Sequence, residues 1–185
     1  MSTYRTDNNG GLGQPNGAVT RPFVIAKFSE LFFLAAEAAV KGATTKAVTG
    51  DYANDGSARG LINIIRARAG MWKYDREDGT TKVEDHSAEM IAATPDQITV
   101  DYVLAERSRE YYGEGYRWYD LVRTQTWGDL SASYRIASAT KGDHTAKTYT
   151  RSIQPYLYLR PVPQGQIDGM EMTDAEKAAY QNPGY

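Results

Sequence analysis

Charged and aromatic side chains alternate closely over residues 106–123, in the stretch ERSREYYGEGYRWYDLVR. An ordinary surface helix keeps its charges on one face and its apolar side chains on the other. Several charges here must therefore lie against packed surface, where a charge is tolerated only when it is paired and hydrogen-bonded. Acidic and basic residues three positions apart are neighbours on a helix and supply the partners. We expect a structural ion-pair network that pairs Glu106 with Arg109, Arg107 with Glu110, and Asp120 with both Arg117 and Arg123.

The same stretch contains two carboxylates whose spacing suggests glycoside hydrolysis. Glu106 and Glu110 are one helical turn apart, which places their Cβ atoms about 6 Å from each other. Glycosidases use two carboxyl groups roughly 5 to 10 Å apart. The neighbouring arginines would lower both carboxyl pKa values, whereas a general acid needs a raised pKa. We therefore predict that the protein is not an enzyme and has no catalytic residues.

Residue types for nucleophilic or metal chemistry are scarce. The chain has no cysteine and two histidines, His86 and His144, which lie in polar sequence far from each other. Neither a G-x-S-x-G nor an H-E-x-x-H pattern is present. Residues 75–79, DREDG, resemble a calcium loop, but their acidic positions are out of register for one. The sequence predicts no metal site and no cofactor.

Sugar binding is the remaining chemistry, since tyrosine and tryptophan combine a flat apolar face with a polar edge. The chain has 14 tyrosines and 3 tryptophans against 4 phenylalanines. Trp72 and Tyr74, followed by Asp75 and Arg76, are candidate ligand-binding residues, and Trp127 near Asp129 is another. Alternatively, Trp72 and Trp127 anchor their loops to the helices.

Helical periodicity predicts the elements that position these residues. A helix is expected over residues 24–41 and a second within 52–69, ending at Gly70 and forming a helical hairpin through a short polar loop. Further helices are expected from Thr99 to Tyr112, over 116–124 and over 173–180, with breaks at Gly113 and Gly115. Residues 71–95 and 128–150 are expected to be polar loops, residues 153–160 to be extended, and residues 182–184 to form a turn. The fold class is therefore mainly α with long irregular loops.

Length and charge narrow the functional classes. At 185 residues the chain is the size of one domain, and its net charge of -2 argues against nucleic acid and anionic membrane surfaces as partners. No apolar run approaches the roughly 20 residues of a membrane span. The first residues carry no signal-peptide pattern and no lipid-acceptor cysteine.

Several stretches together resemble the SusD/RagB family. Residues 106–123 match E-R-x-x-E-L-x-x-E-G-x-R-W-x-D-L-x-R, except that Tyr111 replaces leucine. The segment that runs from Arg21-Pro22-Phe23 to the A-E-A at 36–38 resembles the first family helix, and residues 61–70 contain N-x-I-R-x-R-A-G. Residues 159–164 resemble L-x-P-I-P-Q, and the chain ends in Q-N-P-G-Y.

The resemblance implies a surface-exposed outer-membrane lipoprotein that captures glycans for a TonB-dependent, SusC-like transporter. It also implies a tetratricopeptide-like character for the helical hairpin, and it implies no binding residue, since the matching motifs are scaffold in that family. We expect an irregular leader over residues 1–22 and a SusD/RagB-like C-terminal domain over 23–185, as a portion of a longer protein. Apolar surface facing the remainder is expected at Phe23, Phe33 and Leu34. The alternative is a helical-repeat module that binds another protein and has no sugar site.

Overall fold

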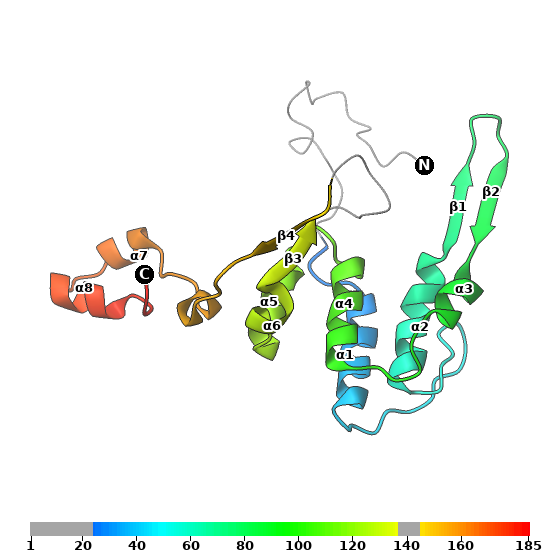
Figure 1. The fold of residues 1–185 in the computed structure, drawn as a ribbon, viewed down its shortest axis with the longest axis horizontal. Coiled ribbons are helices and arrows are strands. Elements are labelled where there is room, and N and C mark those ends of the chain that lie inside the picture. The colour runs from blue at the N-terminus through cyan, green and yellow to red at the C-terminus, as the bar shows by residue number, and fades with distance from the viewer. Residues whose placement is uncertain (1–23, 137–144) are drawn as a thin grey trace. The chain divides into compact units, whose positions relative to one another are not determined.

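The computed structural model describes residues 24–136 and 145–185, and these divide into two compact units (Figure 1). The expected leader, residues 1–22, lies outside the described residues. The first unit ends at Arg109 and the second begins at Glu110. The first contains α1 (Ser29–Val40), α2 (Ala58–Ala69), β1 (Met71–Asp75), β2 (Thr81–Asp85), α3 (Ser87–Ala92) and all but the last residue of α4 (Val100–Glu110). The second contains α5 (Tyr116–Thr124), α6 (Trp127–Ser131), β3 (Ser133–Ile136), β4 (Lys147–Thr150), the 3-10 helix η1 (Pro155–Tyr158), α7 (Gln164–Asp168) and α8 (Asp174–Tyr180).

Helices α1 and α2 run antiparallel and pack against each other in the first unit (Figure 1). Their connection is not the short loop that was predicted, since it extends from Lys41 to Ser57 and contains a bridge between Val48 and Asn54. The Tyr52 ring in this connection contacts Phe28 at 5.4 Å between ring centroids. The hairpin itself is present, and its tetratricopeptide-like character stays a prediction.

The first helix begins at Ser29 rather than at residue 24. The predicted helix extends further upstream because apolar residues continue there at helical spacing. Ile25 and Phe28 are nevertheless 84% and 59% exposed, so this spacing does not reflect burial. The expectation that Phe23, Phe33 and Leu34 form exposed apolar surface is wrong for Phe33. Phe33 is 1% exposed and belongs to the core, whereas Leu34 is 48% exposed and Phe23 lies outside the described residues. Position on a helix decides this difference, because adjacent residues point in different directions.

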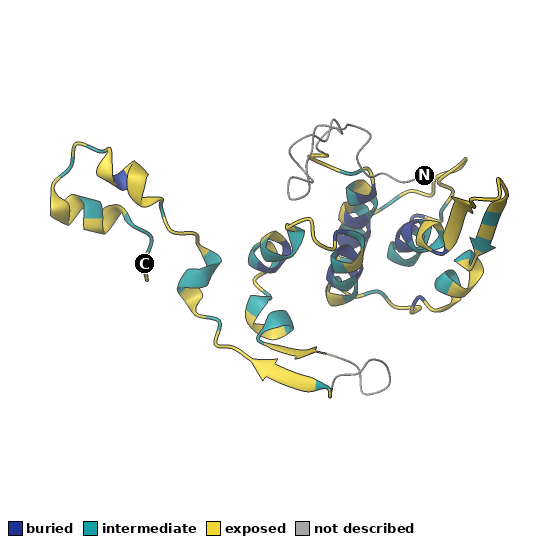
Figure 2. Cartoon of the chain, turned by 90° about the horizontal axis from the view of Figure 1, so that it is seen from above, coloured by how far each residue is buried: buried dark blue, intermediate teal, exposed yellow. Residues whose placement is uncertain are grey.

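The core of the first unit is formed by side chains from three helices, which carry most of the buried residues in Figure 2. Its buried apolar members are Phe33 and Ala36 of α1, Leu61, Ile62 and Ile65 of α2, and Val103 and Leu104 of α4. Burial of one large aliphatic or aromatic side chain contributes roughly 1.5 to 3 kcal/mol. Packing of α1, α2 and α4 around this core therefore fixes the positions of the polar groups that the same helices carry.

Residues 71–95, predicted to be a loop, instead form the antiparallel hairpin β1–β2 followed by α3. The turn between the strands uses Gly79 at φ 79°, a conformation that favours glycine. All five residues of β1 are exposed, so the strand lacks the one-sided apolar alternation that marks a half-buried strand. This exposure is the physical reason why the sequence resembles a loop.

Gly70 ends α2 as predicted, but for a different physical reason. Its φ is -77°, so no left-handed conformation is involved. A Cβ atom at this position would lie 2.9 Å from both the carbonyl carbon and the carbonyl oxygen of His86. The backbone of His86 also donates a hydrogen bond to the Gly70 carbonyl over 2.9 Å. Gly70 is therefore required by the close approach of the two chain segments.

The predicted helices around the glycine break are present. The Thr99 hydroxyl accepts a hydrogen bond from the Tyr102 amide at the start of α4. Gly113 and Gly115 have φ values of 78° and 82°, which end α4 and allow the chain to start α5 over the predicted residues. Two glycines thus encode this break locally.

The second unit has more regular structure than was predicted. Residues 128–150 include most of α6 and the antiparallel pair β3–β4, and Pro155 begins the 3-10 helix η1 where an extended segment was expected. Helix α7 was not predicted. Helix α8 has the predicted capping box between Thr173 and Glu176, and a hydrogen bond from the Tyr185 amide to the Asn182 carbonyl closes the terminal turn. Helices are thus the predominant regular structure of the described residues, and they are accompanied by two small two-stranded antiparallel sheets.

Candidate functional site

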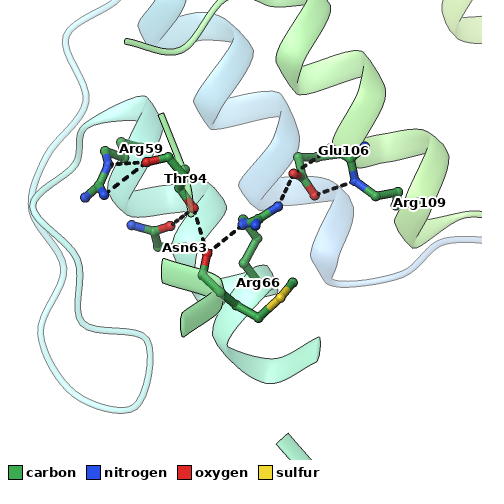
Figure 3. Close-up of polar contacts among 7 residues, drawn as sticks. Arg59, Asn63, Arg66, Thr94, Glu106 and Arg109 are labelled. Atoms are coloured by element: carbon green, nitrogen blue, oxygen red, sulfur yellow. Dashed lines mark hydrogen bonds and ion pairs between the residues drawn. The ribbon is translucent and has the colours of Figure 1, made fainter. Parts of the chain in front are cut away.

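A buried ion-pair cluster connects α2 to α4, with Glu106 at its centre (Figure 3). The Glu106 carboxylate accepts hydrogen bonds from Arg66 over 2.5 Å and from Arg109 over 2.6 Å. Glu106 is 5% exposed, whereas the Arg109 side chain is 57% exposed. Two arginines therefore balance the negative charge of one carboxylate. Arg66 lies inside the unit, and Arg109 lies at its surface.

The protonation of Glu106 follows from these neighbours. Burial alone would raise the pKa of Glu106, but hydrogen bonds from Arg109 and Tyr102 and the charges of Arg109 and Arg66 outweigh it and hold the pKa below its ordinary value. Burial and the hydrogen bond to Glu106 raise the pKa of Tyr102, so the phenol keeps its proton and acts as a donor. A carboxyl group of lowered pKa is the opposite of what a general acid requires.

A row of polar side chains on α2 also fastens the C-terminal end of α3 (Figure 3). Arg59 donates to the Thr94 carbonyl over 3.1 Å, and Arg66 donates to the Met90 carbonyl over 3.0 Å. The Thr94 hydroxyl donates to the Asn63 side chain over 2.7 Å. Carbonyls at a helix end lack partners within the helix, and positive charges there are favourable. The row explains how a helix of only 6 residues is held in place.

Sequence reasoning missed this row of Arg59, Asn63 and Arg66. Its members are spaced by four and three residues, which places them on one face of a helix. That spacing, within the N-x-I-R-x-R-A-G stretch and just before it, is a usable signal for a polar row on one face of the helix. Their partners at Met90 and Thr94 are backbone or small side-chain groups, which no charge pattern reveals.

Arg107 pairs with α1 in the structure. Its guanidinium donates to the Glu30 carboxylate over 3.4 Å and lies 5.9 Å from the centroid of the Phe33 ring. Arg107 is 2% exposed, so its charge is enclosed by the core. Glu110, the partner expected from spacing, is half-buried at the end of α4. The long-range partner Glu30 was not predicted.

The second unit holds the remaining members of the expected network. Asp120 is 1% exposed and lies 3.7 Å from the Arg123 guanidinium. Burial lowers the pKa of Arg117, and the charge of Asp120 acts in the opposite direction. The expected residues therefore fall into two groups, one in each unit, and their structural role stays a proposal.

The stretches LRPVPQ and QNPGY bind each other within the second unit. The Gln181 side chain accepts a hydrogen bond from the Val162 amide over 2.7 Å and donates one to its carbonyl over 3.0 Å. The Asn182 side chain donates to the Arg160 carbonyl, and the Tyr185 hydroxyl donates to the Leu159 carbonyl. Side-chain amides and a phenol thus hold a segment whose prolines cannot donate backbone hydrogen bonds. We call this set of contacts the C-terminal clamp.

Trp127, the third candidate ligand-binding residue, is packed among other side chains. Its ring meets Trp118 at 6.4 Å and Tyr158 at 5.7 Å between centroids, both in edge-on geometry. The Tyr158 hydroxyl accepts hydrogen bonds from the amides of Trp127 and Gly128. Trp127 is half-buried, and this geometry favours the alternative in which it anchors its segment.

Trp72 and Tyr74 lie on β1 with their side chains on the same face of the hairpin, because side chains alternate along a strand. They are 62% and 39% exposed. Lys82 and Glu84 are their partners across the hairpin, and these two form an ion pair with each other. We call Trp72, Tyr74, Lys82 and Glu84 the aromatic face of the hairpin. Lys82 and Glu84 were missed because their position beside the two rings depends on strand pairing, which the residue pattern does not reveal.

Among the described residues, the remaining candidates for catalysis or metal binding do not form an assembled site. In the part of the chain that the structure describes, no three acidic, histidine or cysteine side chains form a metal-binding group. His86 lies 3.2 Å from Glu89 on the surface, and His144 lies outside the described residues. Residues 75–79 belong to the tip of the hairpin, where the Asp78 carboxylate accepts hydrogen bonds from Thr80.

The comparison with known families decides the identity of the chain. The sequence profile of the SusD family matches residues 5–185. The chain belongs to the SusD family. No curated protein matches it. The clusters around Glu106 and in the C-terminal clamp therefore occur in the stretches by which the chain resembles SusD proteins.

SusD proteins bind glycans or other nutrients and are typically associated with the outer membrane. The family is a binding family that is not known for enzymatic activity, and it generally works with a SusC-like transporter. Among the helices described for this chain, none is long and apolar enough to cross a membrane.

Proposed function

We propose that this SusD protein captures oligosaccharides and passes them to a SusC-like, TonB-dependent transporter at the outer membrane. The observation that carries the proposal is the family match over residues 5–185. The proposed mechanism is binding and transfer without covalent chemistry. The arginine-compensated Glu106 supports this view, since its lowered pKa makes it a structural anion.

The proposal includes a position at the cell surface, reached through a lipid anchor as in other SusD-like lipoproteins. Its test uses intact cells that produce the natural full-length protein. Surface protease should degrade the protein in intact cells, and the protein should co-purify with the transporter encoded beside its gene. Retention in the soluble fraction, with no transporter recovered, would contradict this function.

A protein-binding module is the second candidate, because α1 exposes apolar side chains. Phe28, Leu31 and Leu34 are 59%, 58% and 48% exposed on or next to this helix. The two candidates differ in their ligand. A glycan array that shows binding favours oligosaccharide capture, whereas an empty array together with one reproducible protein partner favours the interaction module.

A further inference from the structure

We propose that the aromatic face of the β1–β2 hairpin is a binding platform for neutral oligosaccharides. This inference rests on the proposed function, because it assigns the glycan site of the chain to Trp72, Tyr74, Lys82 and Glu84. Figure 1 shows the hairpin projecting away from the helices of its unit, so its faces are accessible within that unit.

The register of the hairpin brings the four side chains together. Trp72 is paired directly with Glu84, and Tyr74 is paired directly with Lys82. Side chains two residues apart on one strand lie about 6.7 Å from each other and point to the same side. The two rings therefore form a short row that can stack on successive sugar units, with charged groups alongside to bind their hydroxyls.

Trp72 has no structural role that the described residues reveal. Its side chain is 62% exposed, and the described part of the chain supplies no stacking ring, cation or hydrogen-bond partner for it. The other two tryptophans differ in this respect. Trp118 lies beneath the Arg160 guanidinium at 4.3 Å from its ring centroid, and Trp127 contacts Tyr158. Of the three indoles, Trp72 is the one whose flat face is available to a ligand.

The polar half of the face is held in position. Lys82 forms an ion pair with Glu84, and its ammonium lies 5.9 Å from the centroid of the Tyr74 ring. The hydrogen bond and charge of Lys82 lower the pKa of Glu84, and Glu84 and Tyr74 raise the pKa of Lys82. Both groups therefore stay charged at neutral pH. A carboxylate can accept a hydrogen bond from a sugar hydroxyl, and an ammonium can donate one.

Charge and size select the class of ligand. Residues 71–85 carry three basic and five acidic side chains, so an anionic sugar would meet net repulsion. The face is only two strands wide, or about 4.8 Å between strand axes. A stable protein interface covers about 800 Å² on each partner, which exceeds this surface. A neutral oligosaccharide chain fits both limits.

The test follows the indole N–H resonances of the nitrogen-15-labelled 185-residue chain by NMR. Its three tryptophans give three such resonances, and the Trp72→Ala variant identifies the one from Trp72. The probes are maltoheptaose, cellohexaose and laminarihexaose as neutral sugars and trigalacturonate as the acidic contrast. We expect at least one neutral sugar to shift the Trp72 resonance while the other two tryptophans stay in place, and trigalacturonate to shift none.

Variants then measure the contribution of the two rings to affinity. Trp72→Ala and Tyr74→Ala should each raise the Kd for the shifting sugar about tenfold, because each removes one stacking surface. Val83→Ala is the control on the opposite face of the same hairpin, and Tyr112→Ala is the control for loss of an exposed aromatic ring. Both controls should bind like the unmodified chain. Wild-type affinity in Trp72→Ala would overturn the proposal.

The outcomes separate this inference from the proposed function. Binding of a neutral sugar with an unchanged Trp72 resonance would overturn the platform and leave glycan capture in place. Preference for trigalacturonate at Trp72 would overturn the assignment to neutral sugars. No binding by the natural full-length protein to any glycan of an array would overturn both. The ligand-induced shifts are followed in the unmodified chain, so the alanine variants serve only to assign the Trp72 resonance and to compare affinities.

Discussion

The Arg66 guanidinium donates a hydrogen bond to the Glu106 carboxylate over 2.5 Å, although the residues are 40 positions apart in the sequence. Their side chains are 12% and 7% exposed, so the contact lies inside the first unit. It joins α2, which carries the N-x-I-R-x-R-A-G stretch, to α4, which carries the start of the ERSRE stretch. Two sequence motifs of the SusD family thus form one polar cluster.

Removal of Arg66 is expected to destabilise the first unit. Arg66→Met leaves the buried Glu106 carboxylate with less compensation and removes the bond to the Met90 carbonyl, and breaking such a buried pair costs about 3 kcal/mol. Urea unfolding should show a lower midpoint with an unchanged m-value. Arg76→Met, at the exposed hairpin tip, is the control and should change stability by less than about 0.5 kcal/mol. Equal midpoints for the two variants would contradict the role of Arg66.

The lowered pKa of Glu106 predicts a specific loss of stability in acid. The folded state holds this pKa below its ordinary value of 4.5, so the folded protein resists protonation that the unfolded chain accepts. The contribution is fully present above pH 4.5 and is lost as the pH falls through the lowered folded-state pKa. Glu106→Gln should therefore show a smaller fall in unfolding free energy over this range. Parallel pH profiles for the variant and the wild type would refute the assignment.

Two glycines at helix ends should respond differently to alanine. Gly70→Ala places a Cβ atom 2.9 Å from the His86 backbone, which cannot move without disturbing the hairpin, and should cost about 2 kcal/mol. Gly169 at the end of α7 has a similar φ of -76°, and its nearest contact would be 3.4 Å. Gly169→Ala should therefore be nearly neutral in thermal unfolding. A neutral Gly70→Ala would show that the His86 segment yields easily.

The C-terminal clamp predicts a local effect at Val162. Gln181→Glu keeps the shape of the side chain but replaces the amide donor with an acceptor, so the bond to the Val162 carbonyl is lost and two acceptors face each other. Hydrogen exchange of the Val162 amide should accelerate by about tenfold or more, as expected for the loss of roughly 1.4 kcal/mol of local stability.

The control for the clamp is Gln166→Glu, on the exposed surface of α7. It adds the same charge without a clamp contact, so Val162 exchange should stay at the wild-type rate. Acceleration of equal size in both variants would mean that added charge, rather than the lost hydrogen bond, causes the effect.

The position of the binding face could be predicted from the sequence only in part. Trp72 and Tyr74 were identified from residue type, but their partners Lys82 and Glu84 depend on strand register. β1 is exposed along its whole length, and the half-buried positions of β2 carry Lys82 and Glu84, so apolar alternation does not mark either strand in the sequence. Trp127 was also identified from residue type, but the side chains that it packs against could not be predicted. Sequence spacing does not connect it to Trp118 and Tyr158.

Local chemistry by itself determined where several elements of this protein begin and end. Gly113 and Gly115 separate α4 from α5, and the Thr173–Glu176 capping box starts α8, because these features act through neighbouring backbone groups. The motifs determined the family. Only the tertiary structure decided that Arg66 and Glu30 compensate the charges of α4, that Gly70 is needed for close packing, and that the Gln181 amide holds Val162. These contacts join residues far apart in sequence, and their formation depends on packing around the shared core rather than on any local pattern.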